Sequence, residues 1–160
     1  MVRMVVLGRG AAGKSALAAR LGAITGAPVI ELDTVFWNAD LTVTPPAEWA
    51  AVQRDLAAGS SWILDGDLGP YDVLDVRLRR ADTVVVLDLS LARCAWRALR
   101  RSRERIDFWR WVVTYRRRWL PAIMAAIAQR APDARVHVLH RPRDVRELVR
   151  GTGGAASPSP

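Results

Sequence analysis

Gly8-Arg9-Gly10-Ala11-Ala12-Gly13-Lys14-Ser15 fills every fixed position of G-x-x-x-x-G-K-[ST], the pattern of a phosphate-binding loop, within a chain of 160 residues. Lys14 is the only lysine among the 24 basic residues, and all the others are arginine. A lysine ammonium is a compact charge on a flexible stem that reaches the outer phosphates of a nucleotide, whereas a planar guanidinium does not fit such a loop in the same way. The segment therefore predicts a nucleotide-binding site.

The residues on either side of this loop fit the motif. Residues 2–7 form a short apolar run that is typical of a buried parallel strand. Residues 15–21 have helix-forming composition, and Gly22 is the expected stop. In this context the loop and the helix N-terminus wrap a β-phosphate, Lys14 neutralises the β- and γ-phosphate oxygens, and the Ser15 hydroxyl binds Mg²⁺. A chance match without a nucleotide is the alternative. The predicted nucleotide-binding residues are Gly8, Gly10, Ala11, Ala12, Gly13, Lys14, Ser15 and Ala16.

Length and composition indicate one folded domain over residues 1–150. The chain is long enough for one sizeable core, with 51% hydrophobic residues and a mean hydropathy of +0.05. Residues 151–160 contain only Gly, Ala, Ser, Pro and Thr, so we expect a disordered tail. No apolar stretch is long enough to span a bilayer, no signal peptide precedes the loop, and Cys94 is the only cysteine. These features predict a cytoplasmic protein without membrane contact, with Cys94 packed as a small hydrophobe.

Short apolar runs alternate with helical stretches along the chain, which predicts an α/β fold with a parallel sheet. We expect further strands at residues 28–32, 62–64, 83–87 and 135–139 and helices at 47–58 and 144–149. An arginine-rich helical region covers residues 91–130, with expected breaks near residues 102–107 and Pro121.

Three of the predicted strands are followed by an aspartate, namely Asp33, Asp65 and Asp88. Ligands of open parallel sheets bind outside the carboxyl ends of the strands, so these carboxylates should gather beside the loop. A phosphotransferase needs acids there to hold Mg²⁺ through water and to orient the accepting hydroxyl. The alternative is that each acid caps a turn or helix. We favour the functional interpretation for Asp33 and Asp65 and the capping interpretation for Asp88.

The net charge of +8 is concentrated between Arg93 and Arg118, where ten arginines face only Glu104 and Asp107. Such a patch suits nucleic acid, an anionic membrane surface or the phosphates of a small substrate, and genomic base composition also enriches arginine. Aromatic residues interleaved with arginine are typical of single-strand binding surfaces. Their helical spacing favours a buried stripe instead, made of Phe108, Trp111, Tyr115 and Trp119. Trp37 is a candidate wall of an acceptor pocket, and Trp49 is expected to be packing.

Segments 8–15, 29–37, 62–66 and 79–89 resemble the adenylate-kinase-related P-loop proteins known as topology-modulation proteins, in the superfamily of nucleoside monophosphate kinases. The resemblance extends to about Arg150. It implies a three-layer P-loop NTPase fold with a five-stranded parallel sheet of order 2-3-1-4-5 and an ATP donor with Mg²⁺. It also implies that Asp65, in the pair Asp65-Gly66, holds the magnesium shell. Arg97 and Arg101, one helical turn apart, would sandwich the adenine and reach the phosphates.

The chain departs from adenylate kinase at two places. Asp67-Leu68-Gly69-Pro70 stands where adenylate kinase has Phe-Pro-Arg, whose arginine grips the acceptor phosphate, so AMP is not the expected acceptor. The lid is shortened to residues 102–107, where Arg103 and Arg105 would swing onto the transferred phosphoryl group. In the run of arginines at 116–118, at most one or two side chains can face a common site on a helix.

The sequence thus predicts a phosphotransferase that moves the γ-phosphoryl group of ATP to a small acceptor. Its expected cofactors are ATP and Mg²⁺, with Ser15 and Asp65 as metal ligands. The alternative is a nucleotide-binding regulatory protein that contacts nucleic acid through residues 93–118 and has little or no kinase activity. The identity of the acceptor and the oligomeric state stay open. The expected catalytic residues are Lys14, Asp33, Arg97, Arg101, Arg103 and Arg105.

Overall fold

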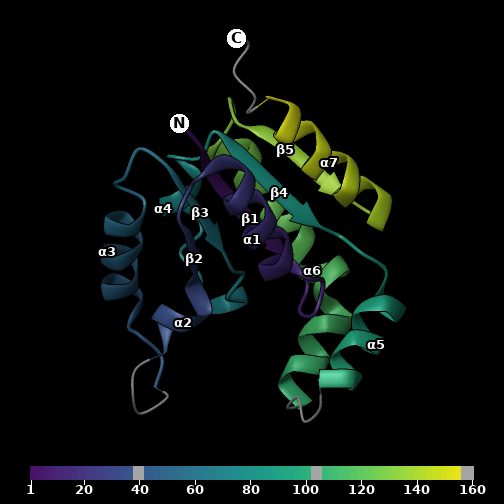
Figure 1. Cartoon of the computed structure of the whole chain (residues 1–160). Helices are drawn as coiled ribbons and strands as arrows, with labels where there is room; N and C mark the ends of the chain where they lie inside the picture. Colours follow the sequence, from purple (N-terminus) through teal and green to yellow (C-terminus); the bar gives the residue numbers. More distant parts are fainter. Residues whose placement is uncertain (38–41, 102–105, 156–160) are drawn as a thin grey trace.

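A five-stranded, all-parallel sheet lies at the centre of the structure (Figure 1). The computed structural model describes residues 1–37, 42–101 and 106–155. The strand order is β2-β3-β1-β4-β5, which confirms the predicted α/β fold and strand order. The strands are β1 (Arg3–Gly8), β2 (Val29–Glu31), β3 (Trp62–Asp65), β4 (Thr83–Leu87) and β5 (Arg135–Leu139).

Helices cover both faces of this sheet, so the central residues of the inner strands are apolar and buried. In Figure 1, α1 lies in front of the sheet and α6 behind it. One core joins α1 and α7 to the sheet, and the other joins α3, α4 and α6 to its opposite face. The short α2 follows β2, and α5 lies beside the first half of α6. The helices are α1 (Lys14–Thr25), α2 (Leu32–Phe36), α3 (Pro46–Leu56), α4 (Asp75–Leu78), α5 (Leu91–Arg101), α6 (Ile106–Arg130) and α7 (Pro142–Ala155).

The sheet itself requires the first glycine of the phosphate-binding loop. Gly8 is the last residue of β1, pairs with Leu87 of β4 and has a φ of 145°. A Cβ atom at this position would lie 2.7 Å from the Leu87 carbonyl oxygen, so no larger residue fits. On the other side of β1, Val6 pairs with Asp65, the last residue of β3. The loop and the predicted metal ligand therefore start from adjacent strand ends.

Helix α1 extends beyond the predicted stop at Gly22. A Cβ atom at Gly22 would lie 2.4 Å from Val29 Cγ2, so this glycine allows close packing of α1 on β2. The helix ends before Gly26, which has a φ of 70° and donates its backbone N–H to the Gly22 carbonyl. The glycine that stops the helix is thus the one that adopts a left-handed conformation.

The predicted break at Pro121 and the predicted tail from Gly151 were wrong. Helix α6 continues through Pro121, which is exposed, so its ring faces solvent rather than the core. Helix α7 runs to Ala155 although Gly151, Gly153 and Gly154 have low helix propensity. Packing of α7 against α1 outweighs that propensity. Residues 156–160 lie outside the described part of the chain.

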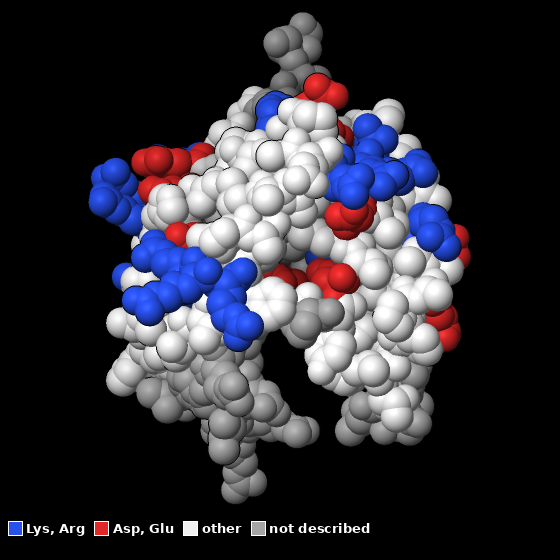
Figure 2. All heavy atoms as spheres, turned by 180° about the vertical axis from the view of Figure 1, so that it is seen from behind, with Lys and Arg blue, Asp and Glu red and all other residues white. Residues whose placement is uncertain are grey.

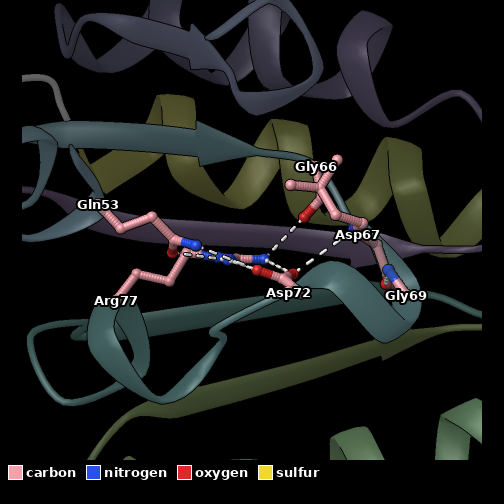
Figure 3. A network of polar contacts seen from close by, with 7 residues as sticks. Gln53, Gly66, Asp67, Gly69, Asp72 and Arg77 are labelled. Carbon is pink, nitrogen blue, oxygen red and sulfur yellow. Dashed lines mark hydrogen bonds and ion pairs between the residues drawn. The ribbon is translucent and has the colours of Figure 1, made fainter. Parts of the chain in front are cut away.

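A buried ion pair fixes the loop that follows β3 (Figure 3). The Arg77 guanidinium is fully buried and donates to both carboxylate oxygens of Asp72 at 2.7 Å. It also donates to Gln53 Oε1 at 2.8 Å and to the Gly66 carbonyl at 2.9 Å. Burial by itself would raise the pKa of Asp72, but the charge and hydrogen bonds of Arg77 outweigh it and the pKa is lowered. The network ties α3 and α4 to the first residue after β3.

We predict that Arg77→Met destabilises the fold by about 3–5 kcal/mol at neutral pH, because it leaves the Asp72 carboxylate buried without a counter-charge. Urea unfolding measures the loss. Since the folded pKa of Asp72 lies below the unfolded value, its contribution is present above about pH 4 and disappears as the pH falls through the folded pKa. The difference in the free energy of unfolding between the wild type and Arg77→Met should therefore decrease at acidic pH.

The double variant Arg77→Met/Asp72→Leu is the control for this prediction. Replacing both partners by apolar side chains removes the unpaired charge, so most of the lost stability should return. Equal stabilities of wild type and Arg77→Met at neutral pH would contradict the assigned role of the ion pair.

Candidate functional site

The loop between β1 and α1 has the shape of an anion cradle. Ala11 and Gly13 have positive φ angles of 58° and 94°, and no side chain caps the start of α1. The Lys14 side chain folds back over the loop and donates to the carbonyl oxygens of Gly8 at 3.0 Å and Arg9 at 3.3 Å. Unpaired N–H groups at a helix N-terminus favour an anion, and a twelve-residue helix adds its dipole. The geometry fits the predicted phosphate site.

Ser15 and Asp65 lie next to each other beside this loop. Asp65 is only 3% exposed, and the Ser15 side chain hydrogen-bonds to it. Its Oδ1 atom is buried and has no hydrogen-bond partner among the described residues. Burial raises the pKa of Asp65, while Ser15 and Lys14 oppose the shift. A buried, unpaired carboxylate oxygen next to a hydroxyl is the donor set that a nucleotide-bound Mg²⁺ uses.

No group of three or more His, Cys, Asp or Glu residues that could hold a metal by itself occurs in residues 1–37, 42–101 and 106–155. Magnesium at nucleotide sites takes one or two protein ligands and completes its shell with phosphates and waters. Ser15 and Asp65 fit this role, whereas an all-protein metal cage does not fit the described residues.

Asp33 lies on the same side of the sheet, but not at the end of a strand. Strand β2 ends at Glu31, and Asp33 is an exposed residue in the first turn of α2. Partial desolvation raises the pKa of Asp33, Lys14 lowers it, and Glu31 raises it further. The pKa of Asp65 responds to Asp33 as well. The structure therefore brings Asp33, Asp65 and Lys14 into one electrostatic environment.

Asp67 is a functional candidate that sequence reasoning missed. Its Oδ1 accepts the backbone N–H of Gly69 at 3.1 Å, and its Oδ2 accepts the Tyr115 hydroxyl at 3.1 Å. Burial raises the pKa of Asp67, and Lys14 lowers it. The available signal was its place two residues after Asp65. Asp33, Asp65 and Asp67, which all interact with Lys14, are called the acid cluster below.

The aromatic residues of the predicted stripe on α6 divide into described and undescribed members. Tyr115 is fully buried and Trp119 packs against the same core, as predicted. Burial raises the pKa of Tyr115, and its hydrogen bond to Asp67 raises it further, so its hydroxyl stays a donor. The side chains of Phe108 and Trp111 lie outside the described part of the structure.

Asp88 is a buried carboxylate that contacts two side chains from other parts of the described chain. It is 3% exposed and accepts hydrogen bonds from Arg116 Nε and Nη2 at 2.9–3.1 Å. His140 Nδ1 lies 3.2 Å from Asp88 Oδ2. Two side chains from distant segments therefore contact this carboxylate, and its predicted role as a cap stays a prediction. The contact anchors α6 at the carboxyl end of β4.

The predicted arginine clamp falls at the edge of the described structure. Arg97 and Arg101 lie one turn apart on α5, but their side chains are outside the described part, as are Arg103 and Arg105 entirely. Trp37 is 44% exposed and contacts Phe36 edge-on, with ring centroids 5.1 Å apart. Its role as a pocket wall stays a prediction, while the fully buried Trp49 is packing, as predicted.

A groove of about 460 Å³ adjoins the loop on the α1 and α7 face. A larger groove of about 760 Å³ lies between the sheet and α7 and includes no residue of the loop, so we assign no role in the site to it. Figure 2 shows acidic atoms at the head of a hollow on the back of the molecule, with basic atoms along one flank. The groove beside the loop, called the P-loop groove below, is lined by Ala11, Ala12, Gly13, Ala16, Leu17, Arg20, Leu87, Leu89, Pro142, Val145 and Arg146.

Solved structures of small-molecule kinases share this fold. A shikimate kinase from Acinetobacter baumannii in complex with shikimate matches with a TM-score of 0.66 and 14% identity, over 94% of this chain and 90% of the other. A sugar kinase from a Janibacter species matches with a TM-score of 0.58 and 20% identity, over 99% and 100% of the two chains. A gluconokinase from Sinorhizobium meliloti matches with a TM-score of 0.57 and 16% identity, over 97% and 91%. The fold is therefore that of P-loop kinases.

Neither a family model nor a curated protein matches the chain. Membership of the topology-modulation proteins therefore stays a prediction. Within the described ranges, none of the helices has the length and apolar character needed to cross a membrane.

We predict that Asp65→Asn raises the midpoint of thermal unfolding of the ligand-free protein at neutral pH. The folded pKa of Asp65 lies above its unfolded value, so the ionised carboxylate opposes folding at neutral pH and the amide removes that penalty. The difference should shrink as the pH falls through the raised pKa. The control is Asp55→Asn, at an exposed position on α3, which should change little. A lower midpoint for Asp65→Asn would contradict the conclusion that the buried carboxylate opposes folding.

Proposed function

We propose that this protein is an ATP-dependent kinase that transfers the γ-phosphoryl group to a hydroxyl group of a small acceptor. The observation that carries the proposal is the juxtaposition of three groups at the carboxyl end of the sheet. They are the phosphate cradle with Lys14 folded over it, the Ser15 hydroxyl, and the buried Asp65 carboxylate with one unpaired oxygen. The shared fold of the kinase structures supports it.

On the donor side, each part of the cradle has a distinct task. The loop N–H groups hold the β-phosphate, and Lys14 exchanges the carbonyl oxygens of Gly8 and Arg9 for phosphate oxygens. Ser15 and Asp65 would hold Mg²⁺, which neutralises charge that develops on the phosphates. The P-loop groove, which starts at the same loop, would take the nucleoside. Arg97 and Arg101 are proposed to clamp the base, with Arg103 and Arg105 closing over the phosphates.

On the acceptor side, Asp33 is the proposed base. The hydroxyl oxygen of the acceptor attacks the γ-phosphorus, the bond from that phosphorus to the β,γ-bridging oxygen breaks, and the hydroxyl proton passes to Asp33. Desolvation raises the pKa of Asp33 and Glu31 adds to the shift, which makes the carboxylate a better proton acceptor. Asp67, held by the Tyr115 hydroxyl, supplies a second carboxylate that can orient the acceptor.

The acceptors named for two neighbours support a small hydroxylated molecule. Gluconokinase and shikimate kinase act on compounds that are not nucleotides. The absence of an arginine at residues 67–70, where adenylate kinase grips a nucleotide phosphate, points the same way.

Lys14→Ala should abolish detectable phosphoryl transfer and weaken ATP binding about tenfold or more, because a charge-assisted contact to phosphate is lost. Turnover is measured against a panel of small alcohols, sugars and nucleoside monophosphates, and ATP affinity by calorimetry. Far-UV circular dichroism should be unchanged, since this side chain lies on a loop. Wild-type affinity and turnover in the variant would refute the assigned phosphate site. The matched control is Arg54→Ala, an exposed cation on α3.

Arg97→Ala or Arg101→Ala should each lower ATP affinity or turnover by about tenfold, because each removes a charged contact to base or phosphate. The same control, Arg54→Ala, should have little effect. Single-strand and duplex binding by the parent protein, measured at several salt concentrations, tests the alternative function. Tight binding that weakens steeply with salt, together with wild-type ATP affinity in both variants, would favour a nucleic-acid-binding regulator instead.

A further inference from the structure

Arg9, the second residue of the phosphate-binding segment, is a buried cation without a counter-charge in the described structure. Its side chain is almost fully enclosed, since only 2% of the residue is exposed. Nε and Nη1 are both buried, and neither has a hydrogen-bond partner among the described residues. The guanidinium forms a cation–π contact with the face of the Tyr115 ring, whose centroid lies 5.7 Å from the guanidinium carbon. One cation–π contact does not replace the hydrogen bonds that the guanidinium lost on burial.

Arg77, the other buried arginine of the described residues, has a structural role and serves as a comparison. Arg77 is equally enclosed, and although its Nε is unpaired, its Nη1 and Nη2 atoms donate to Asp72, Gln53 and the Gly66 carbonyl. A buried charge without such partners destabilises the ligand-free fold. The position of Arg9 is therefore explained by a partner that arrives from outside rather than by folding.

The surroundings of Arg9 indicate from which side that partner comes. Tyr115, under the guanidinium, belongs to the core on the α6 face of the sheet, and its hydroxyl donates to Asp67 of the acid cluster. Ala12 and Leu17 of the P-loop groove belong to the core on the opposite, α1 and α7 face. Arg9 thus projects away from the groove assigned to the nucleoside and toward the carboxylates assigned to the acceptor.

We propose that Arg9 binds an anionic group, a carboxylate or a phosphate, of the phosphoryl acceptor. A guanidinium forms charge-assisted hydrogen bonds with either group, and Nε and Nη1, on different edges of the Arg9 guanidinium, are the donors left unpaired here. The guanidinium carbon lies 5.7 Å from the centroid of the Tyr115 ring, and Asp67 accepts the hydrogen bond of the Tyr115 hydroxyl. The acceptor is then a small hydroxylated acid, with its acid group on Arg9 and its hydroxyl groups toward the acid cluster. This inference rests on the proposed kinase function.

Calorimetry with matched acids and neutral analogues tests this assignment. Gluconate and sorbitol, then glycerol 3-phosphate and glycerol, are titrated into protein saturated with Mg²⁺ and a non-hydrolysable ATP analogue. At least one acid should bind the wild type, and its neutral partner should bind much more weakly. Arg9→Gln should weaken binding of that acid about tenfold to a hundredfold. Arg54→Gln, at an exposed position on α3, should bind it as the wild type does.

A second measurement needs no acceptor. Because an unpaired buried cation opposes folding, Arg9→Met should leave the thermal midpoint of the ligand-free protein unchanged or raise it. A clear fall in the midpoint would show that Arg9 stabilises the fold, and that result would overturn the proposal.

The remaining outcomes separate this inference from the proposed function. If the wild type fails to bind the ATP analogue, the kinase assignment fails and the inference falls with it. If the analogue binds tightly but no acid binds, or neutral partners bind equally well, only the assignment of Arg9 to the acceptor is overturned. If Arg9→Gln weakens the analogue as strongly as Lys14→Ala does and leaves acid binding intact, the anion belongs to the donor phosphates, which also overturns the assignment.

Discussion

The buried ion pair between Arg77 and Asp72 positions the residues of the candidate site that follow β3. It leaves no oxygen of Asp72 unpaired, and it holds the Gly66 carbonyl directly after β3. Gly66 has a φ of 148°, and a Cβ atom there would lie 3.0 Å from Leu32 Cβ in α2. The same turn therefore positions Asp65 and Asp67 on one side and the helix that carries Asp33 on the other.

Buried polar groups in this protein fall into two kinds. Asp72 and Arg77 pair with each other, and Asp88 pairs with Arg116, so these charges belong to the architecture. Asp65 Oδ1 and the Nε and Nη1 atoms of Arg9 lack hydrogen-bond partners within the described ranges, and neither side chain has an ion pair there; Arg77 Nε is unpaired too, but the rest of its guanidinium is bound. Arg9 lies in the segment that carries Lys14 and Asp65 lies beside it, and although their charges are opposite, these atoms do not hydrogen-bond to each other. A ligand with a cationic and an anionic part, such as a metal nucleotide together with an acid, would satisfy both.

Local signals were sufficient for the features that the chain encodes in adjacent residues. The loop at 8–15 and the apolar strands that lead to Asp65 and Asp88 were predictable, because each depends on short-range spacing. Helix ends were less predictable from local signals. Glycine and proline are residue types that often end helices, but tertiary packing decides the conformation of Gly22 and Pro121. The partners of Asp88 were not predictable, since they come from α6 and from the residue after β5.

The distribution of charge also links the donor and acceptor sides of the proposed site. Lys14 is the cation that lowers the pKa of all three carboxylates of the acid cluster. When Lys14 turns to the phosphates of a nucleotide, the phosphates and the Mg²⁺ proposed to accompany them add charges of both signs to this environment. The pKa of Asp33 would then depend on whether the donor is bound. Donor binding and the basicity of the proposed base would thus be linked through Lys14, the one cation of the described residues that acts on all three carboxylates.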